Sequence, residues 1–308
     1  MRIFVIVALV VIGIAALPIA ILYLAPARVV RFVIRGERRR AGLERKQIDL
    51  PDDLRYVYLE GGQGEPLLLL HGFGANKDHF SRVARALTVR YRVIIPDHIG
   101  FGESSHPPHA DYSPLAQVER LHAFMQALGI ERCHLGGSSM GGHIALTYAA
   151  IHPSQVASLW LLDAAGAWSA PESELLRVRR ETGRNLLLAS TPAEFAGVIA
   201  FVTAKPPFIP KPLLKALAQE RIGNYELEKR IADQLLADSV EARIADLAIP
   251  ALIVWGEEDR AIHVGSATVL QQLLPRSQVI ILPRVGHLPA VEAPRQTAND
   301  YLRFRDSL

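Results

Sequence analysis

The sequence predicts an α/β fold built on a mostly parallel sheet, and three observations lead to that prediction. Short apolar runs alternate with helical patterns from about Gln47 to the C-terminus, as expected when crossover helices join parallel strands. Several of these runs are apolar without interruption, which is typical of strands covered on both faces. A glycine-flanked serine, Ser139, lies where one such run meets a helical segment. Together these features favour a buried sheet with polar side chains at its carboxyl edge.

The individual elements follow from the same pattern. Strands are expected at residues 55–60, 66–70, 92–96, 133–137, 158–162, 251–255 and 279–282. Helices are expected between them at residues 80–87, 115–128, 140–151 and 267–274. We therefore assign residues 47–166 and 244–308 to one α/β core.

The strand pattern stops between residues 167 and 243, and helical segments are expected at 172–188, 191–202 and 225–236. This stretch is rich in proline and apolar side chains, a composition suited to a lid over a binding site. The lid residues expected to contact substrate are Phe195, Phe201, Phe208 and Leu213. Ordinary packing of these side chains onto the core is the alternative for each of them.

The charge of the chain is unevenly distributed. The 308 residues carry a net charge of +3 and include a single cysteine, Cys133, which cannot form an internal disulfide. Residues 1–46 contain nine basic and two acidic side chains, a local charge of +7, so the remaining 262 residues carry −4. A mildly acidic body disfavours nucleic acid as a partner.

An apolar segment precedes most of this basic cluster. Residues 3–24 are 22 residues without a charge, and as a helix they would span roughly 33 Å, the thickness of a bilayer core. We expect residues 1–27 to form an uncleaved, single-pass anchor in the cytoplasmic membrane; a cleaved signal peptide is the alternative. The basic residues after the span favour a cytoplasmic body, while a periplasmic body stays open.

The segment 28–46 interleaves arginines with apolar side chains, as in Arg31-Phe32-Val33-Ile34-Arg35. This pattern predicts an amphipathic helix on anionic membrane lipid, with a solvated basic linker as the alternative. A homodimer formed through the anchor is a further hypothesis.

The most specific motif is Gly136-Gly137-Ser138-Ser139-Met140-Gly141-Gly142. A nucleophile on a strained strand-to-helix turn needs small residues two positions before and after it. Centred on Ser139, those positions are Gly137 and Gly141, whereas centring on Ser138 would require Met140 to be small. The register therefore selects Ser139 as the nucleophile.

A serine nucleophile needs a general base, and in this architecture the acid and then the histidine follow it along the chain. His287 comes after the last expected strand and is the predicted base. Asp259, after Gly256, is the predicted acid, and Asp163 is the alternative because some hydrolases take the acid from the preceding strand. The expected oxyanion donors are the backbone N–H groups of Phe73 and Met140.

Other motifs are assigned no chemistry. The turn beginning at Asp97 follows a strand, and we expect the Asp97 side chain to bond backbone amides there. The spacing of histidines and the single cysteine fit no metal-binding motif, and no dinucleotide or Walker motif is present, so neither metal nor cofactor is expected.

Across residues 47–308 the chain resembles the α/β-hydrolase superfamily. The likeness rests on four segments in order: 71–74, 137–141, 256–259 and 286–287. In detail the first two segments look most like membrane-anchored lipases, a group that includes monoacylglycerol lipase-like enzymes and bacterial single-span lipases and phospholipases A. The resemblance implies a triad of Ser139, Asp259 and His287, and a lid that lines an acyl pocket.

The expected function is hydrolysis of a fatty-acyl ester in a lysophospholipid, phospholipid or monoacylglycerol by a membrane-anchored serine ester hydrolase. Two alternatives stay open: hydrolysis of a carbon–carbon bond in a small ring-cleavage product, and a non-catalytic lipid-binding module.

Overall fold

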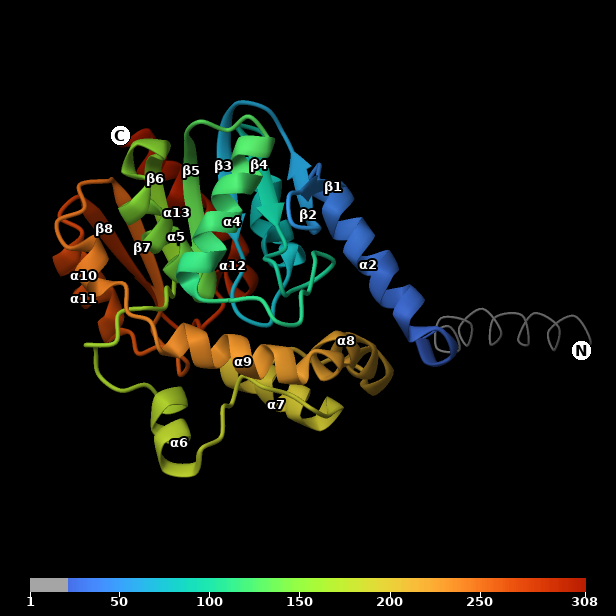
Figure 1. Cartoon of the computed structure of the whole chain (residues 1–308). Helices are drawn as coiled ribbons and strands as arrows, with labels where there is room; N and C mark the ends of the chain where they lie inside the picture. The colour runs from blue at the N-terminus through green and yellow to red at the C-terminus, as the bar shows by residue number, and fades with distance from the viewer. Residues whose placement is uncertain (1–21) are drawn as a thin grey trace, which may run out of the picture.

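A central sheet of eight strands organises the computed structural model, which describes residues 22–308. The strands lie in the order β1-β2-β4-β3-β5-β6-β7-β8, and all pairs from β4 to β8 are parallel, whereas β1 and β2 pair antiparallel at one edge (Figure 1). Their bounds are β1 Glu44–Leu50, β2 Leu54–Gly61, β3 Glu65–Leu70, β4 Tyr91–Pro96, β5 Cys133–Ser138, β6 Val156–Leu162, β7 Ala251–Gly256 and β8 Ser277–Leu282.

Helices cover both faces of this sheet. One face packs against α4 (Pro114–Ala127), α5 (Met140–Ile151) and α11 (Gly265–Leu273), and the other against α3 (Ser81–Leu87) and α13 (Pro294–Asp306). Two short elements, η1 (Lys77–Phe80) and α12 (Pro289–Glu292), lie beside α3, and η2 (Pro153–Gln155) precedes β6. Because the strands between the layers are buried on both sides, they can be apolar throughout.

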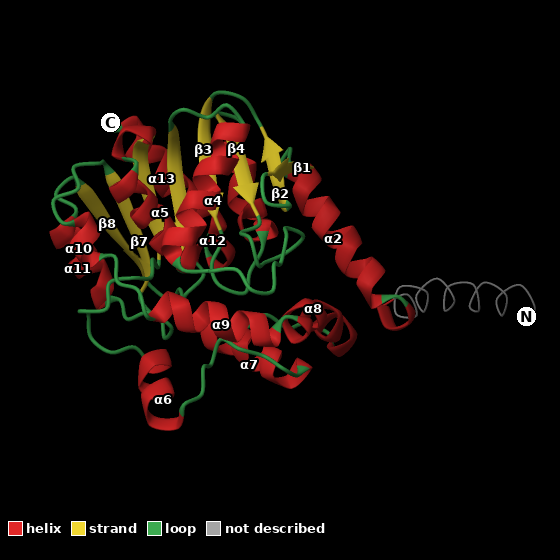
Figure 2. Cartoon of the chain, viewed as in Figure 1, coloured by secondary structure: helices red, strands yellow, loops and turns green. Residues whose placement is uncertain are grey.

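The segment from residue 167 to 243, which we call the helical insertion, lies across one end of the sheet (Figure 2). Its helices are α6 (Glu174–Thr182), α7 (Pro192–Val202), α8 (Lys211–Gly223) and α9 (Tyr225–Leu236), with the start of α10 (Glu241–Ile244). The insertion faces the end of the sheet where the loops after β3, β5, β7 and β8 meet.

The predicted α/β fold with a mostly parallel sheet is confirmed, and the seven expected strands lie within two residues of their observed bounds. Several elements differ, among them the C-terminal helix α13, which was not expected, and the three described next. Strand β1 was not expected because its sequence is polar, and it lies at the exposed edge of the sheet. Helix α6 is shorter than expected because the chain turns at Gly183, whose φ of 72° is left-handed. Helix α8 was missed because prolines flank its start, where Pro is tolerated.

The basic segment after the predicted anchor forms helix α2, Pro26–Arg40. It packs against α8 of the insertion and α3 of the core, and Arg38 donates two hydrogen bonds of 2.6 Å to the Asp78 carboxylate. Within residues 22–308 no helix is both long and apolar enough to cross a membrane. Residues 3–21 of the predicted anchor, and a dimer formed through it, lie outside the part of the chain that the structure describes.

Candidate active site

Ser139 sits on a strained turn between β5 and α5. Its φ of 54° and ψ of −117° are unusual for a residue with a side chain, and strain of this kind is concentrated at functional sites. A Cβ on Gly137 would lie 2.2 Å from the carbonyl oxygen of Gly141, and one on Gly141 would lie 2.1 Å from that of Leu70. Glycine is therefore required on both sides of Ser139. Ser138, in contrast, is the last residue of β5 and is fully buried.

His287 and Asp259 lie on the loops after β8 and β7, and they form a direct pair. The distance from His287 Nδ1 to the Asp259 carboxylate is 2.8 Å. The other Asp259 oxygen accepts hydrogen bonds from the N–H groups of Ala261 and Ile262, at 2.8 and 3.0 Å. The carboxylate is thus fixed by backbone donors, and its orientation holds the imidazole with Nε2 as its free nitrogen. Ser139 and His287 line one cavity.

Asp163, the alternative acid, lies beside this pair. Its Oδ1 accepts a 2.9 Å hydrogen bond from the Gly256 N–H, and no hydrogen bond joins it to His287 among the described residues. Burial raises the pKa of Asp163 well above its usual range, and the nearby Asp259 charge adds to the shift. Burial therefore favours the protonated form of the Asp163 carboxyl, which makes it less suited to accept a hydrogen bond from His287.

Asp163, Asp259 and His287 also offer ligand atoms within 4.8 Å of one another, close enough to surround a cation. Burial favours the protonated form of Asp163, and His287 Nδ1 is already bonded to Asp259, so the three make a poor set of metal ligands. The arrangement suits proton transfer better than metal binding.

The loop after β3, which carries His71 to Gly74, lies close to Ser139. A Cβ on Gly72 would lie 3.2 Å from the Ser139 Cβ, so only glycine lets the loop come this close without a shift. His71 is buried behind the loop, where its Nδ1 lies 2.8 Å from the Gly72 carbonyl oxygen and its Nε2 accepts from the His98 N–H at 3.1 Å. Burial lowers the pKa of His71 to about 3, so the ring is neutral and can bridge these two backbone groups.

Phe73 lines the same cavity as Ser139, and Met140 begins helix α5, where the first backbone N–H groups have no partner within the helix. Both expected donors therefore lie beside the serine.

A residue that sequence reasoning missed, Arg221 of α8, holds this loop from the insertion side. Its guanidinium donates to the Gly74 carbonyl oxygen at 3.1 Å and to the Leu187 carbonyl at 2.5 Å, and it lies 5.5 Å from the centre of the Phe73 ring. Arg221 is 7% exposed, and Glu228 of α9 pairs with it at 2.7 Å. No local motif marks Arg221, because two of its partners, Gly74 and Leu187, lie far from it in the sequence.

The cavity beside Ser139 is narrow and apolar, with a volume of about 30 Å³. Its apolar walls come mainly from the core loops and from α6 and α9; the aliphatic members from the insertion are Leu175, Leu176, Leu187, Ala232, Leu235 and Leu236. These leucines were also missed, although their spacing on α6 and α9 was a usable signal.

The structure places none of the four expected lid residues in this cavity. Phe201 lines a separate, open cavity of about 820 Å³ between α6, α7 and α9, and Phe208 is 92% exposed. Phe195 and Leu213 are half-buried on α7 and α8. The proline-rich segment 203–210 runs over the surface, whereas the inner faces of α6 and α9 point toward Ser139.

The chain is similar in sequence to known hydrolases. Residues 65–196 match a family model described as the alpha/beta hydrolase fold. The chain is 45% identical over 282 residues to a protein named Lipase 3 from Moraxella sp. (strain TA144), covering 90% of this chain and 89% of that protein. It is 30% identical to the monoacylglycerol lipase abhd6-A of Xenopus laevis over 92% of this chain and 88% of that protein.

A solved structure agrees with these relatives. A crystal structure described as a membrane phospholipase A, a bacterial virulence factor, superposes with a TM-score of 0.88 at 40% identity, covering 100% of this chain and 99% of that one. Similarity of this extent spans the core and the helical insertion alike.

Proposed function

Because the chain belongs to the α/β-hydrolase family and is a serine ester hydrolase of the lipase class, we propose that it is a membrane-anchored enzyme that cleaves fatty-acyl esters of lipids. One observation carries the proposal. The strained Ser139 and the Asp259-bonded His287 line a single apolar cavity, closed on one side by the helical insertion.

Each member of the proposed triad has one task. His287 Nε2 takes the Ser139 hydroxyl proton as Oγ attacks the ester carbonyl carbon, and Asp259 stabilises the resulting imidazolium. The imidazolium then returns the proton to the leaving alcohol oxygen, which leaves an acyl-enzyme. Water, activated by the same imidazole, attacks the acyl-enzyme and releases the fatty acid and Ser139.

The negative charge that develops on the carbonyl oxygen needs fixed donors. The backbone N–H groups of Phe73 and Met140 are proposed for this role, since both lie beside Ser139 and Met140 begins a helix, whose N-terminal dipole favours an anion. His71 and Arg221 keep the loop in place through backbone contacts and do not touch the reacting atoms.

The substrate class follows from the cavity walls and from the relatives. The leucines of α6 and α9 form an apolar wall beside Ser139, but a cavity of about 30 Å³ is too small for an acyl chain, so the helical insertion is proposed to act as a lid that moves to admit one. Relatives named as a lipase, a monoacylglycerol lipase and a membrane phospholipase A favour a monoacylglycerol, lysophospholipid or phospholipid substrate. We propose that residues 3–24 anchor the enzyme in the cytoplasmic membrane, where such lipids are concentrated.

The test is a lipid-class activity profile of the purified full chain. We expect release of fatty acid from these esters, and a fall of about 10⁴-fold or more for Ser139→Ala with the fold retained. A Ser138→Ala variant is the matched control and should keep most of its activity. Labelling by a fluorophosphonate probe should need Ser139.

The competing hypotheses predict other results. A non-catalytic lipid-binding module would neither react with the probe nor release fatty acid. A carbon–carbon hydrolase would cleave a ring-cleavage product faster than any lipid ester. Full activity in Ser139→Ala would contradict the proposed mechanism.

A further inference from the structure

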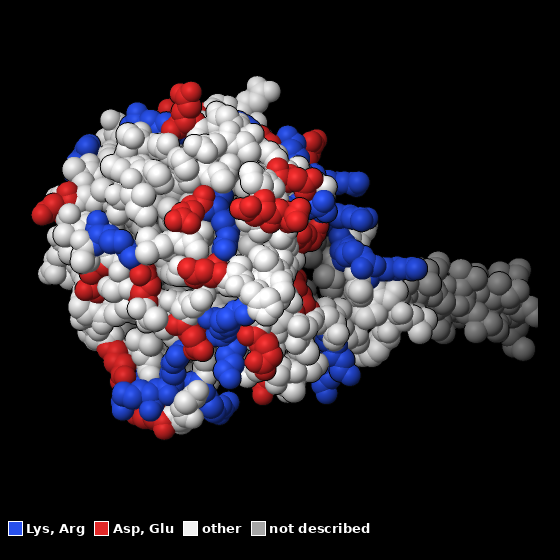
Figure 3. All heavy atoms as spheres, viewed as in Figure 1, with Lys and Arg blue, Asp and Glu red and all other residues white. Residues whose placement is uncertain are grey.

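A basic cavity of about 520 Å³ lies between α2, α8 and the loops after β3 and β4, away from Ser139. Six cationic side chains line it: Arg31, Arg35, Arg38, Arg39, Arg45 and Lys77. Three acidic side chains line it as well: Asp78, Glu103 and Glu220. Cations thus outnumber acids two to one, and Figure 3 shows Lys and Arg side chains gathered where α2 projects from the body.

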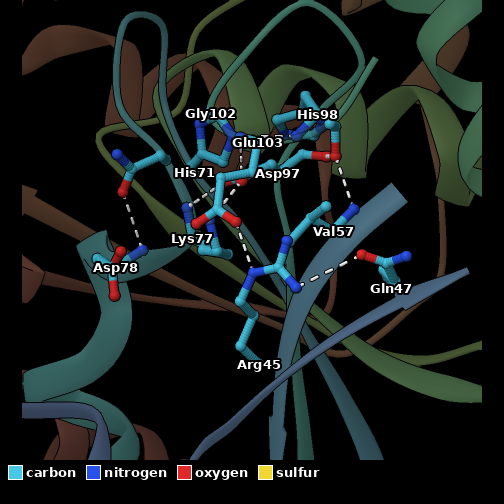
Figure 4. Close-up of polar contacts among 12 residues, drawn as sticks. Arg45, Gln47, Val57, His71, Lys77, Asp78, Asp97, His98, Gly102 and Glu103 are labelled. Carbon is cyan, nitrogen blue, oxygen red and sulfur yellow. Dashed lines mark hydrogen bonds and ion pairs between the residues drawn. The ribbon is translucent and has the colours of Figure 1, made fainter. Parts of the chain in front are cut away.

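Two of these cations, Lys77 and Arg45, are already paired with acidic side chains. Lys77 is buried, 2.7 Å from the Asp97 carboxylate and 3.2 Å from that of Glu103. Arg45 of β1 pairs with Glu103 at 2.5 Å (Figure 4). As expected from the sequence, Asp97 also accepts from the backbone N–H groups of Lys77 and Glu103. This network balances its own charge and leaves no cation free for a ligand.

The cations contributed by α2 differ from these. Arg38 is bonded to Asp78, but within residues 22–308 no acidic side chain forms an ion pair with Arg31, Arg35 or Arg39. Their spacing of four residues places them along one side of α2, where like charges repel. An anion in the cavity would relieve that repulsion, and guanidinium groups match the oxygens of a phosphate.

The same helix carries large apolar side chains that face solvent. On α2, Phe32 is 78% exposed and Val33 54%, and Leu24, which precedes the helix, is 85% exposed. A soluble phosphate has no use for such neighbours, whereas a phospholipid presents its phosphate directly beside acyl chains. The combination of free guanidinium groups and exposed apolar residues on one helix therefore favours a lipid headgroup.

We propose that the basic cavity binds the phosphate headgroup of an anionic phospholipid. The bound lipid would contact Asn76, which lines the cavity and directly follows the loop that carries Phe73. The site is separate from the reaction centre. It rests on the proposed membrane location but not on the ester hydrolysis, so the two can fail independently.

The test is a thermal-unfolding measurement on the full chain in nonionic detergent. Ether-linked phosphatidylglycerol and ether-linked phosphatidylcholine are compared at equal mole fraction, because the proposed enzyme cannot cleave an ether. We expect phosphatidylglycerol to raise the Tm by about 5 °C and phosphatidylcholine to change it little. Binding of either lipid in the cavity beside Ser139 is common to both and cancels in the comparison.

Two double variants of equal charge separate a built site from general attraction. Arg31→Gln/Arg35→Gln removes two cavity arginines, and Arg28→Gln/Arg40→Gln removes two from the same helix that do not line the cavity. Glutamine keeps the helix propensity. We expect the first variant to lose most of the Tm rise and the second to keep most of it, with short-chain ester activity unchanged in both.

Three results would overturn the proposal. The first is an equal rise with both lipids, and the second an equal loss in both double variants, which would indicate attraction by net charge alone. The third is a rise of the same size with millimolar inorganic phosphate, which would assign the cavity to a soluble anion. Loss of ester hydrolysis in the wild type, with the lipid effect intact, would contradict only the proposed function.

Discussion

The core edge that carries Ser139 and the helical insertion that covers it contribute to the site in different ways. At the core edge, backbone atoms fix the geometry. Carbonyl oxygens around Ser139 leave no room for a Cβ on the neighbouring glycines, and backbone N–H groups donate hydrogen bonds to Asp259. In the insertion, side chains make the contacts to the site, as when the Arg221 guanidinium donates hydrogen bonds to the carbonyl oxygens of Gly74 and Leu187. The core edge should therefore tolerate almost no change, whereas the insertion should be adjustable.

The largest effect is expected from the choice of acid at the core edge. Asp259→Asn removes the carboxylate that orients His287 and should lower kcat for a short-chain ester about 10⁴-fold. Asp163→Asn should lower kcat less than about tenfold, because burial favours the uncharged form of this carboxyl, which an amide resembles. Steady-state kinetics with circular dichroism for folding measures both. A larger loss for Asp163→Asn would make Asp163 the acid.

Glycine-to-alanine substitutions compare the two regions directly. Gly137→Ala places a methyl 2.2 Å from a backbone oxygen and should lower the free energy of unfolding by about 3 kcal/mol. Gly197→Ala, in helix α7 of the insertion, meets no atom within 4 Å and should raise it by about 0.5–1 kcal/mol. Denaturant unfolding measures each change. Equal tolerance at the two positions would remove the distinction between the regions.

Arg221 tests whether the insertion acts on the chemistry. Arg221→Met removes the bonds to the Gly74 loop and should lower kcat about 30-fold with a smaller change in KM, because Phe73, the proposed oxyanion donor, loses its support. Arg179→Met, which removes a surface pair with Asp233 on the same insertion, is the control and should leave kcat unchanged. A change in KM alone would assign Arg221 to substrate binding.

The smallest effect concerns acid stability of the loop behind Ser139. Burial lowers the pKa of His71 to about 3 and that of His98 well below its usual value. Above about pH 6.5 both histidines are neutral in the folded and unfolded chain. Below pH 6.5 only the unfolded chain takes up these protons. The free energy of unfolding therefore decreases as the pH is lowered, by about 1 kcal/mol per histidine between pH 6.5 and 5.5.

Denaturant unfolding at several pH values measures this slope. His98→Gln should flatten it, while His109→Gln, at an exposed position, should leave it unchanged. An unaltered slope in His98→Gln would indicate that His98 is protonated in the folded protein.

Much of the fold was predictable because its signals are local. Uninterrupted apolar runs gave the parallel strands, and the strand β1 was missed because an exposed edge needs no apolar pattern. Around Ser139 the glycine spacing selected the register, since neighbouring backbone leaves no room for a Cβ. The insertion was recognised as helical, but its inward-facing residues were not: Phe208 is exposed, while Leu235 lines the cavity.

The sequence by itself determined the α/β class, the strained position of Ser139 and the order in which Asp259 and His287 follow it, because backbone sterics and strand order act over short distances. Only the tertiary structure decided that His287 bonds Asp259, that burial raises the pKa of the neighbouring Asp163, and that Arg221 reaches Gly74. These relations depend on side chains brought together from distant segments. Burial then shifts the pKa values of the titratable side chains among them, and no local sequence pattern predicts such a shift.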